Sequence, residues 1–500
     1  MRNSTGKTKI LLNRPLFSFA LFFFLFVLLL IVKSNILRAP YCWDVLGYVN
    51  RAASSFYKTG QIASLTGLTG HPPLFFIALA SVWKLFGNSL LVSHIFILFL
   101  GASSLFILFK LADKLYGPRE AVAATVLLLS NQLFFAQVGT IYLSIPITCL
   151  AILTVYLYLD KRLLLYGISA AAMLLVKETT IVVLLSIILC DFFWNVLNKE
   201  KFLFCVRRIV FLTLPVIPLG FWYLYHWHMT GWLVNTKLVV NRTRFVSLFM
   251  ENSFRYLIFD NSAENVTKVN WIVFLGISVF IVFQIAKRKS LKLEMIFLMI
   301  VIMNILFFSY SDDLPRYFLV IYPFYFVLGS KAFVFIFDRM KYKDFLLSLF
   351  LAAVVVASVM NYTGHRNTDG WRLESNMEYL DFVKVSRWAG QFLEDNYPDH
   401  KIITTFPLSV AYRNPRLGYI KKSLSVIPFD KFDDFEEVLV VKTYQANFLF
   451  FNRFLQANKH RLVKIEEFFF KGKRIIIYRK KKEVLSEDRY IMRKLWYLAQ

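Results

Sequence analysis

The 500-residue sequence is poor in charge and in cysteine. Charged residues make up 18% of the chain and apolar residues 57%, against about 25% and about 45–50% in an ordinary soluble domain. This composition excludes a disordered chain and a nucleic-acid-binding domain. Three of the four cysteines lie in apolar runs, so no disulfide framework is predicted. Zinc-ligand spacings, a P-loop and a glycine-rich nucleotide fingerprint are also missing, so the sequence indicates neither a metal nor another cofactor.

Long apolar runs are abundant instead. A helix that crosses a bilayer needs about 20 mostly apolar residues, and basic residues gather in cytoplasmic loops. We therefore assign most of the net charge of +26 to membrane topology rather than to a polyanionic partner. The fold class predicted is a polytopic α-helical membrane protein embedded in a lipid bilayer. Its eleven predicted spans are 16–36, 89–111, 120–137, 145–160, 163–177, 179–197, 208–228, 270–286, 293–310, 317–337 and 345–361.

The orientation follows from the basic clusters. Four basic residues precede the first span and place the N-terminus in the cytoplasm. Segment 163–197 has basic residues at both ends, so it is predicted to cross twice, with its apex at residues 177–180 on the outer face. We expect a multi-pass protein of a bacterial inner (plasma) membrane, with an archaeal or endoplasmic-reticulum membrane as the alternative.

The composition changes after residue 361. Residues 1–361 are predicted to form the transmembrane domain, whose outer loop 38–88 carries interfacial helices. Residues 362–485 lack spanning runs and are predicted to form an extracytoplasmic α/β domain, followed by a tail at 486–500. Its expected elements are helices at 375–396 and 448–457 and strands at 401–406, 437–442 and 474–479.

Ionisable side chains near the membrane surface are candidates for function, because their burial in lipid is costly. Asp44 can serve as a general base toward an acceptor hydroxyl, or it can be a helix N-cap in the run Asp44-x-x-x-Tyr48. His71 precedes two prolines that predict a helix start, and alone it is a weak ligand signal. Lys177 can bind a phosphate and Glu178 can poise that lysine or a substrate hydroxyl, or both can be solvated charges at a hairpin.

A second outer cluster precedes the tenth span. It contains Asp312, Asp313, Arg316 and Tyr317. The guanidinium of Arg316 has the planar, permanently charged fork that suits phosphate oxygens. The alternative is again solvated charge at a helix end. Because no nucleotide motif is present, a phosphate carried by a lipid is the natural anionic ligand.

Taken in order along residues 16–361, these motifs resemble the GT-C superfamily of membrane glycosyltransferases. The similarity is greatest to the protein O-mannosyltransferase and lipid A aminoarabinose transferase branch. The motifs are Asp44-x-x-x-Tyr48, Gly60, His71-Pro72-Pro73-Leu74, Leu85-Phe86-Gly87, Leu111-Ala112-Asp113-Lys114-Leu115-Tyr116-Gly117, Leu174-Leu175-Val176-Lys177, Arg316-Tyr317 and Tyr322-Pro323.

The resemblance implies a polyprenyl-phosphate sugar as donor and transfer on the outer face to a lipid, glycan or protein acceptor. It implies that Asp44 is the base and that Lys177 and Arg316 hold the donor phosphate. Attack opposite the leaving group would invert the anomeric carbon. Supporting or substrate-binding roles are expected for Tyr48, His71, Glu178, Asp312, Asp313 and Tyr317.

The sequence departs from the family pattern at two points. Val45 follows Asp44 where a second acid is common, and Ser144 stands where an acid often precedes the proline of the next outer loop. Glu178, Asp312 or Asp313 can replace that acid, or the acceptor can differ. The alternatives are a transporter or flippase of a lipid-linked glycan and a non-catalytic homologue in envelope assembly. An odd span count and the lack of a repeat argue against a transporter.

The sugar and the acceptor are not encoded in a readable motif. Acceptor choice is predicted to lie in the 229–269 loop and in the C-terminal domain. The aromatic residues between 222 and 232 can stack on sugar rings, but an interfacial aromatic belt is the favoured interpretation.

Overall fold

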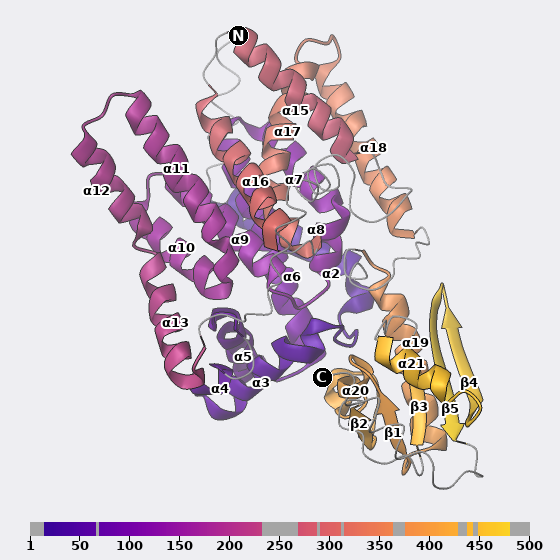
Figure 1. The fold of residues 1–500 in the computed structure, drawn as a ribbon. Coiled ribbons are helices and arrows are strands. Elements are labelled where there is room, and N and C mark those ends of the chain that lie inside the picture. The colour runs from indigo at the N-terminus through magenta and orange to yellow at the C-terminus, as the bar shows by residue number, and fades with distance from the viewer. Residues whose placement is uncertain are drawn as a thin grey trace. The chain divides into compact units, whose positions relative to one another are not determined.

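The structure is a computed structural model, and its packing divides the chain into two compact units (Figure 1). The residues it describes are 15–66, 70–232, 269–287, 291–311, 315–363, 376–428, 438–443 and 449–480. The first unit contains residues 15–37, 48–363 and Asn376, with the gaps just given, and the second contains 38–47 and 377–480. Each unit is described by itself.

The regular elements among the described residues of the first unit are all helices. Its helices are α2 Pro15–Val32, α3 Asn50–Thr59, α4 Ala63–Thr66, α5 Leu74–Phe86, α6 Leu90–Leu115, α7 Pro118–Ser130, α8 Gln132–Gln137, α9 Ser144–Leu159, α10 Leu163–Val176, α11 Ile181–Leu197, α12 Phe202–Thr213, α13 Val216–Thr230, α15 Val269–Ala286, α16 Lys292–Ser311, α17 Tyr322–Phe337 and α18 Lys343–Thr363. Short 3₁₀ segments cover Ser34–Ile36, Glu178–Thr180 and Pro315–Ile321, and the turn Val45–Val49, which spans the boundary between the units, is π-helical.

Helices lie in all eleven segments predicted to span the membrane. Six described helices are long and apolar enough to cross a bilayer, and the bent pair α12–α13 makes a seventh. Three of the four other predicted spans contain α9, α10 and α16, whose apolar stretches are shorter, and the fourth contains α7 and α8. The protein is therefore a multi-pass α-helical membrane protein, and the count of eleven crossings stays a prediction.

Helices α6 and α17 form the centre of this unit. Helix α6 packs against α2, α7 and α9, and α17 packs against α7, α15 and α16. Most side chains of α17 are buried, whereas α2 exposes large apolar side chains such as Phe23 and Phe24. A helix that is apolar all round is buried in protein or in lipid. Helix α17 is buried in protein, and α2 has the outward apolar surface that lipid requires.

Two predicted spans are interrupted by residues that end helices. Asn131 separates α7 from α8, because its side chain accepts a hydrogen bond from the Phe134 N–H at 3.0 Å and so caps the new helix. Pro215 lies between α12 and α13, which meet at an angle of 48°. Proline removes a backbone donor and clashes with the preceding turn, so the segment 208–228 is divided between two helices.

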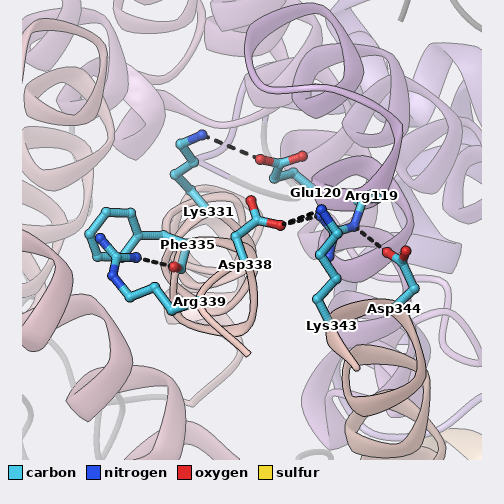
Figure 2. Close-up of polar contacts among 8 residues, drawn as sticks. All are labelled: Arg119, Glu120, Lys331, Phe335, Asp338, Arg339, Lys343 and Asp344. Atoms are coloured by element: carbon cyan, nitrogen blue, oxygen red, sulfur yellow. Dashed lines mark hydrogen bonds and ion pairs between the residues drawn. The ribbon is translucent and has the colours of Figure 1, made fainter. Parts of the chain in front are cut away.

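Ion pairs join α7, α17 and α18 at one end of the helices (Figure 2). Arg119 contacts Asp338 at 2.5 Å and Asp344 at 2.9 Å. Lys331 contacts Glu120 at 3.3 Å. Figure 2 shows these five side chains converging from three helices. The loops around 119 and 338–344, both predicted to be cytoplasmic, therefore lie at the same end of the bundle.

Two of the predicted functional residues, Lys177 and Arg316, lie at the ends of α10 and α17 that are farthest from the loops predicted to be cytoplasmic. Helix α10 runs from the Arg162 end, where Arg162 pairs with Asp160 at 2.7 Å, to Lys177. The segment from Arg316 likewise continues through α17 to Asp338. At 1.5 Å per residue, the 14 residues of α10 separate its two ends by about 20 Å.

The second unit contains a five-stranded sheet in the order β2-β1-β3-β5-β4. Its strands are β1 Lys401–Thr404, β2 Val426–Pro428, β3 Val438–Thr443, β4 Leu462–Phe470 and β5 Lys473–Lys480. Strand β1 is parallel to β2 and β3, and β5 is antiparallel to β3 and β4. Helix α19 Tyr379–Asn396 packs on β4 and β5.

The remaining helices of the second unit are α20 Leu408–Ala411 and α21 Leu449–Ala457. Phe451 and Phe454 of α21 form a core with Ile403 and Leu462. Both predicted helices and all three predicted strands are present, with small shifts at their ends. Strands β2 and β4 were not predicted, because β2 is only three residues long and β4 carries charges among its apolar residues.

Candidate functional site

Lys177 and Glu178 lie at a rigid break between α10 and α11. The backbone of Lys177 is extended (φ −156°, ψ 125°), which ends α10. The Thr180 hydroxyl donates to the Lys177 carbonyl at 2.7 Å and contacts the Met173 carbonyl at 3.2 Å. These hydrogen bonds fasten the turn to the last turn of α10. The predicted hairpin apex is therefore a fixed structure rather than a loose loop.

Arg316 lies at the start of the 3₁₀ helix Pro315–Ile321, which leads into α17. This segment packs against α8, α9 and α16, and Arg316 is 9% exposed. Pro315 is compatible with a helical first turn, where its missing N–H costs nothing. The surrounding helices thus hold the guanidinium in a buried position.

Lys177 and Arg316 contact the same aromatic ring. The Lys177 Nζ lies 3.5 Å from the centroid of the Tyr317 ring, and the Arg316 guanidinium carbon lies 5.6 Å from it. The same guanidinium lies 4.7 Å from the ring centroid of Tyr142. Lys177 is 5% exposed. Two buried cations on one ring concentrate positive charge, and such a place favours an anion.

His71 and Glu178 form a pair beside these cations. The His71 Nδ1 lies 3.2 Å from each carboxylate oxygen of Glu178, although the residues are 107 positions apart. Both side chains are about one quarter exposed, at 28% and 27%. The Tyr48 ring centroid lies 5.7 Å from that of His71. Because Glu178 follows Lys177 directly, the first outer loop and the hairpin apex contribute to one site.

Trp232, the last of the aromatic residues between 222 and 232, lies against Gly70, which directly precedes His71. A Cβ placed on Gly70 would lie 3.3 Å from the Trp232 ring. Trp232 is held by His226, whose Nδ1 lies 3.0 Å from the Trp232 carbonyl and whose ring centroid is 4.4 Å away. The aromatic run 222–232 was the available signal, but its periodicity does not reveal that Trp232 reaches Gly70.

Tyr142 is a site residue that sequence reasoning missed. It lies two residues before Ser144, which begins α9, and it is buried. The region was noticed only because Ser144 stands where related proteins often have an acid. The structure gives this region a different feature, an aromatic face for Arg316.

Asp44 belongs to the second unit and is half-buried. It directly precedes the π-helical turn Val45–Val49, and the preceding residue, Trp43, has φ 48°. π-helical turns and tryptophan residues with a positive φ are uncommon in proteins. Where they do occur, they are often close to functional sites. The same position at a helix start is where an N-cap would lie, so the local structure is compatible with both interpretations of Asp44.

Asp312 and Asp313 lie outside the described residues. Among the residues that are described, no three His, Cys, Asp or Glu side chains are grouped so that they could hold a metal ion. The structure therefore brings Tyr48, His71, Lys177, Glu178, Arg316 and Tyr317 together in the first unit, with Asp44 in the second.

Comparison with known proteins identifies the fold. Residues 70–222 match the family model of dolichyl-phosphate-mannose-protein mannosyltransferase. The crystal structure of ArnT from Cupriavidus metallidurans bound to undecaprenyl phosphate is similar, with a TM-score of 0.53 and 12% identity over 90% of this chain and 97% of ArnT. The chain has the GT-C fold. The resemblance predicted from the motifs is thereby confirmed.

Two further structures agree with this result. Apo ArnT from the same organism has a TM-score of 0.54 and 11% identity, over 90% of this chain and 97% of that one. The archaeal oligosaccharyltransferase AglB from Archaeoglobus fulgidus, in complex with an inhibitory peptide and a dolichol-phosphate, has a TM-score of 0.51 and 10% identity, over 93% of this chain and 75% of AglB. No curated protein matches the sequence at a significant level. The family match includes His71, Lys177 and Glu178, and it ends before Arg316.

Proposed function

We propose that the protein is a glycosyltransferase that moves a sugar from a polyprenyl-phosphate-linked donor to an acceptor hydroxyl on the outer face of the membrane. The observation that carries this proposal is the pair of buried cations, Lys177 and Arg316, on the Tyr317 ring. The ArnT and AglB structures named above contain polyprenyl phosphates. Among ligands of a GT-C fold, a lipid phosphate is the anion that suits such a site.

In the proposed reaction the cations stabilise the leaving group. The acceptor oxygen forms a bond to the anomeric carbon while the bond from that carbon to the phosphate oxygen breaks. The electron pair leaves with the polyprenyl phosphate, whose negative charge grows. Lys177 and Arg316 are held on the Tyr317 ring before the donor binds, and stabilisation of a developing charge by preorganised groups is a large contribution to catalysis.

Asp44 is the proposed general base. Its carboxylate would accept the proton of the acceptor hydroxyl as the new bond forms. Attack from the face opposite the phosphate inverts the anomeric configuration. Related proteins often have an acid at the position of Ser144. Glu178, which pairs with His71, is the proposed replacement for that acid. Their hydrogen bond holds in place a carboxylate that also interacts electrostatically with Lys177.

The proposed membrane is a bacterial inner (plasma) membrane, with the N-terminus in the cytoplasm and the C-terminal unit outside. The grouping of two predicted inner loops through Arg119, Asp338 and Asp344 supports this orientation. The site residues at the other ends of α10 and α17 would then face outward. The acceptor is a lipid, a glycan or a protein.

The test uses the full chain reconstituted in lipid nanodiscs with a polyprenyl-phosphate sugar and candidate acceptors. Wild-type protein is expected to release polyprenyl phosphate in step with glycosylated acceptor. Asp44→Asn should lose at least about 10²-fold in turnover and still bind the donor. Full activity of Asp44→Asn would contradict the base assignment. Sugar-lipid movement across liposomes without any transfer would favour a flippase instead.

A further inference from the structure

The short segment 38–47, which carries Asp44, belongs to the second compact unit, although the residues before and after it in the chain belong to the first. Its neighbours come from the region around residues 406 and 419. This contact between distant segments arises from the tertiary structure, and no sequence motif predicts it. The C-terminal region therefore supplies the surroundings of the segment that carries the proposed base.

A buried hydrogen bond ties the two parts of the second unit together. The Tyr419 hydroxyl donates to the Tyr41 carbonyl at 2.7 Å, across 378 positions of sequence. Both residues are buried, at 1% and 4% exposed. Burial raises the pKa of the Tyr419 phenol well above its usual value, so this hydroxyl remains a donor at any ordinary pH.

Phe406 packs against Trp43 and Gly47, which precede and follow Asp44 in the chain. Its ring centroid lies 5.7 Å from that of Trp43 in an edge-to-face arrangement. A Cβ added to Gly47 would lie 3.3 Å from the same ring. Aromatic pairs of this geometry contribute about 0.5–1.5 kcal/mol beyond burial. Phe406 therefore limits movement of the residues before and after Asp44.

The backbone held in this way is strained. Trp43 has φ 48°, a left-handed conformation that a bulky residue rarely adopts. The N–H groups of Leu46 and Gly47 both bond to the Trp43 carbonyl, at 2.9 and 3.2 Å. Such a conformation persists only where neighbouring contacts enforce it. The contacts that enforce it here include those of Phe406 and Tyr419.

We propose that Tyr419 and Phe406 are positioning residues, through which the C-terminal unit holds the Asp44 turn in the conformation needed for catalysis. This inference rests on the proposed function, in which Asp44 is the base. A base must be held within about 0.5 Å of its productive position, and a displacement of about 1 Å can cost 10²-fold in rate. The C-terminal unit then contributes to the reaction without supplying the reacting carboxylate.

The test compares two buried tyrosines whose hydroxyl groups donate to backbone carbonyls in different segments. Tyr419→Phe removes the hydroxyl bound to the Tyr41 carbonyl. Tyr412→Phe removes an equally buried hydroxyl that donates to the Ser386 carbonyl of α19 at 2.7 Å. Each loses one buried hydrogen bond to a backbone carbonyl, so their losses of folding stability should be similar. Only Tyr419→Phe should disturb the turn.

Two readouts are measured in the reconstituted full chain. The first is transfer: Tyr419→Phe should lower kcat about 10-fold with an unchanged KM for the polyprenyl-phosphate sugar, and Tyr412→Phe should stay within about 2-fold of wild type. The second is alkylation of Cys42, a buried cysteine within the segment. Its rate should rise in Tyr419→Phe and not in Tyr412→Phe.

Phe406→Leu is the second variant and should act as Tyr419→Phe does. Equal effects of Tyr419→Phe and Tyr412→Phe on kcat would show a general structural role and overturn the proposal. Faster Cys42 alkylation with an unchanged kcat would also overturn it. If wild-type protein transfers no sugar, the proposed function fails by itself. The alkylation result then still decides whether Tyr419 holds the segment.

Discussion

The substitution Lys177→Met separates the chemical from the structural role of the buried cations. It removes the charge and keeps a linear apolar side chain. Several terms determine its effect on stability without donor, among them the lost attraction between Lys177 and the neighbouring Glu178 carboxylate. Loss of the contact between the Lys177 Nζ and the Tyr317 ring, at 3.5 Å, costs about 2 kcal/mol at a desolvated site. Relief of the repulsion between Lys177 and Arg316 acts in the other direction.

The repulsion can be gauged from the structure. The two cations lie 3.5 and 5.6 Å from one ring centroid, so they are separated by at most about 9 Å. At an effective dielectric constant of about 20, this corresponds to about 2 kcal/mol or more. These two terms are similar in size and opposite in sign, and the lost attraction to Glu178 remains. We therefore expect donor-free Lys177→Met to melt slightly below wild type, by about 2–4 °C.

Transfer should respond very differently. Removal of one preorganised group that stabilises developing charge typically costs about 10²–10³-fold in rate, and we expect a loss of this size in single-turnover transfer from a labelled polyprenyl-phosphate sugar. The control is Lys384→Met, which removes an exposed lysine whose Nζ lies 4.0 Å from the Phe470 ring centroid. It should retain wild-type activity. Lys177→Met with near-normal transfer would refute the assignment of this lysine to the donor phosphate.

Two further substitutions test the site and the packing. Glu178→Gln keeps the shape but removes the charge of the carboxylate 3.2 Å from the His71 Nδ1, and it should lower kcat by about 10²-fold with little change in donor binding. Gly329→Ala places a methyl group 2.6 Å from a methyl carbon of Val273. This overpacking should destabilise the protein by about 1–3 kcal/mol, measured by thermal unfolding in detergent.

The matched controls lie elsewhere in the same unit. Glu120→Gln alters a carboxylate that pairs with Lys331 at the other end of the bundle, so transfer should stay near wild type. An equal loss of kcat in Glu120→Gln and Glu178→Gln would contradict a catalytic role specific to Glu178. A Cβ added to Gly220 would meet open space within 4 Å, and Gly220→Ala should not destabilise the protein. Unchanged stability of Gly329→Ala would contradict the close packing of α17.

Much of the helical unit could be predicted from sequence, because its signals are local. The apolar runs mark the helices, Pro72 and Pro73 precede the start of α5 at Leu74, and the basic clusters around 161 and 199 require the break at Lys177. The interruption at Asn131 was missed because an N-cap in the middle of an apolar run looks like part of the span. The hydrogen bond that its side chain accepts from the Phe134 N–H caps the start of α8 and so interrupts the span.

The arrangement of the site could not be predicted in the same way. The pairing of His71 with Glu178 and the shared ring of Tyr317 depend on contacts between residues far apart in sequence. Periodicity has no information about such contacts. The same is true of the segment carrying Asp44, which packs with Phe406 and Tyr419 because of tertiary structure alone. The cost of burying ionisable groups in lipid and the motif resemblance indicated the residues, and the structure shows which of them are in contact.

The central claim is a sugar transfer from a polyprenyl phosphate, and the anomeric configuration of the product tests it most directly. Purified protein in nanodiscs would be given a donor of known configuration, and the product would be analysed by nuclear magnetic resonance. We predict a glycosylated acceptor of inverted configuration together with one polyprenyl phosphate released per sugar transferred. A product that retains the donor configuration would contradict direct displacement with Asp44 as base, and absence of any product would contradict the proposed function.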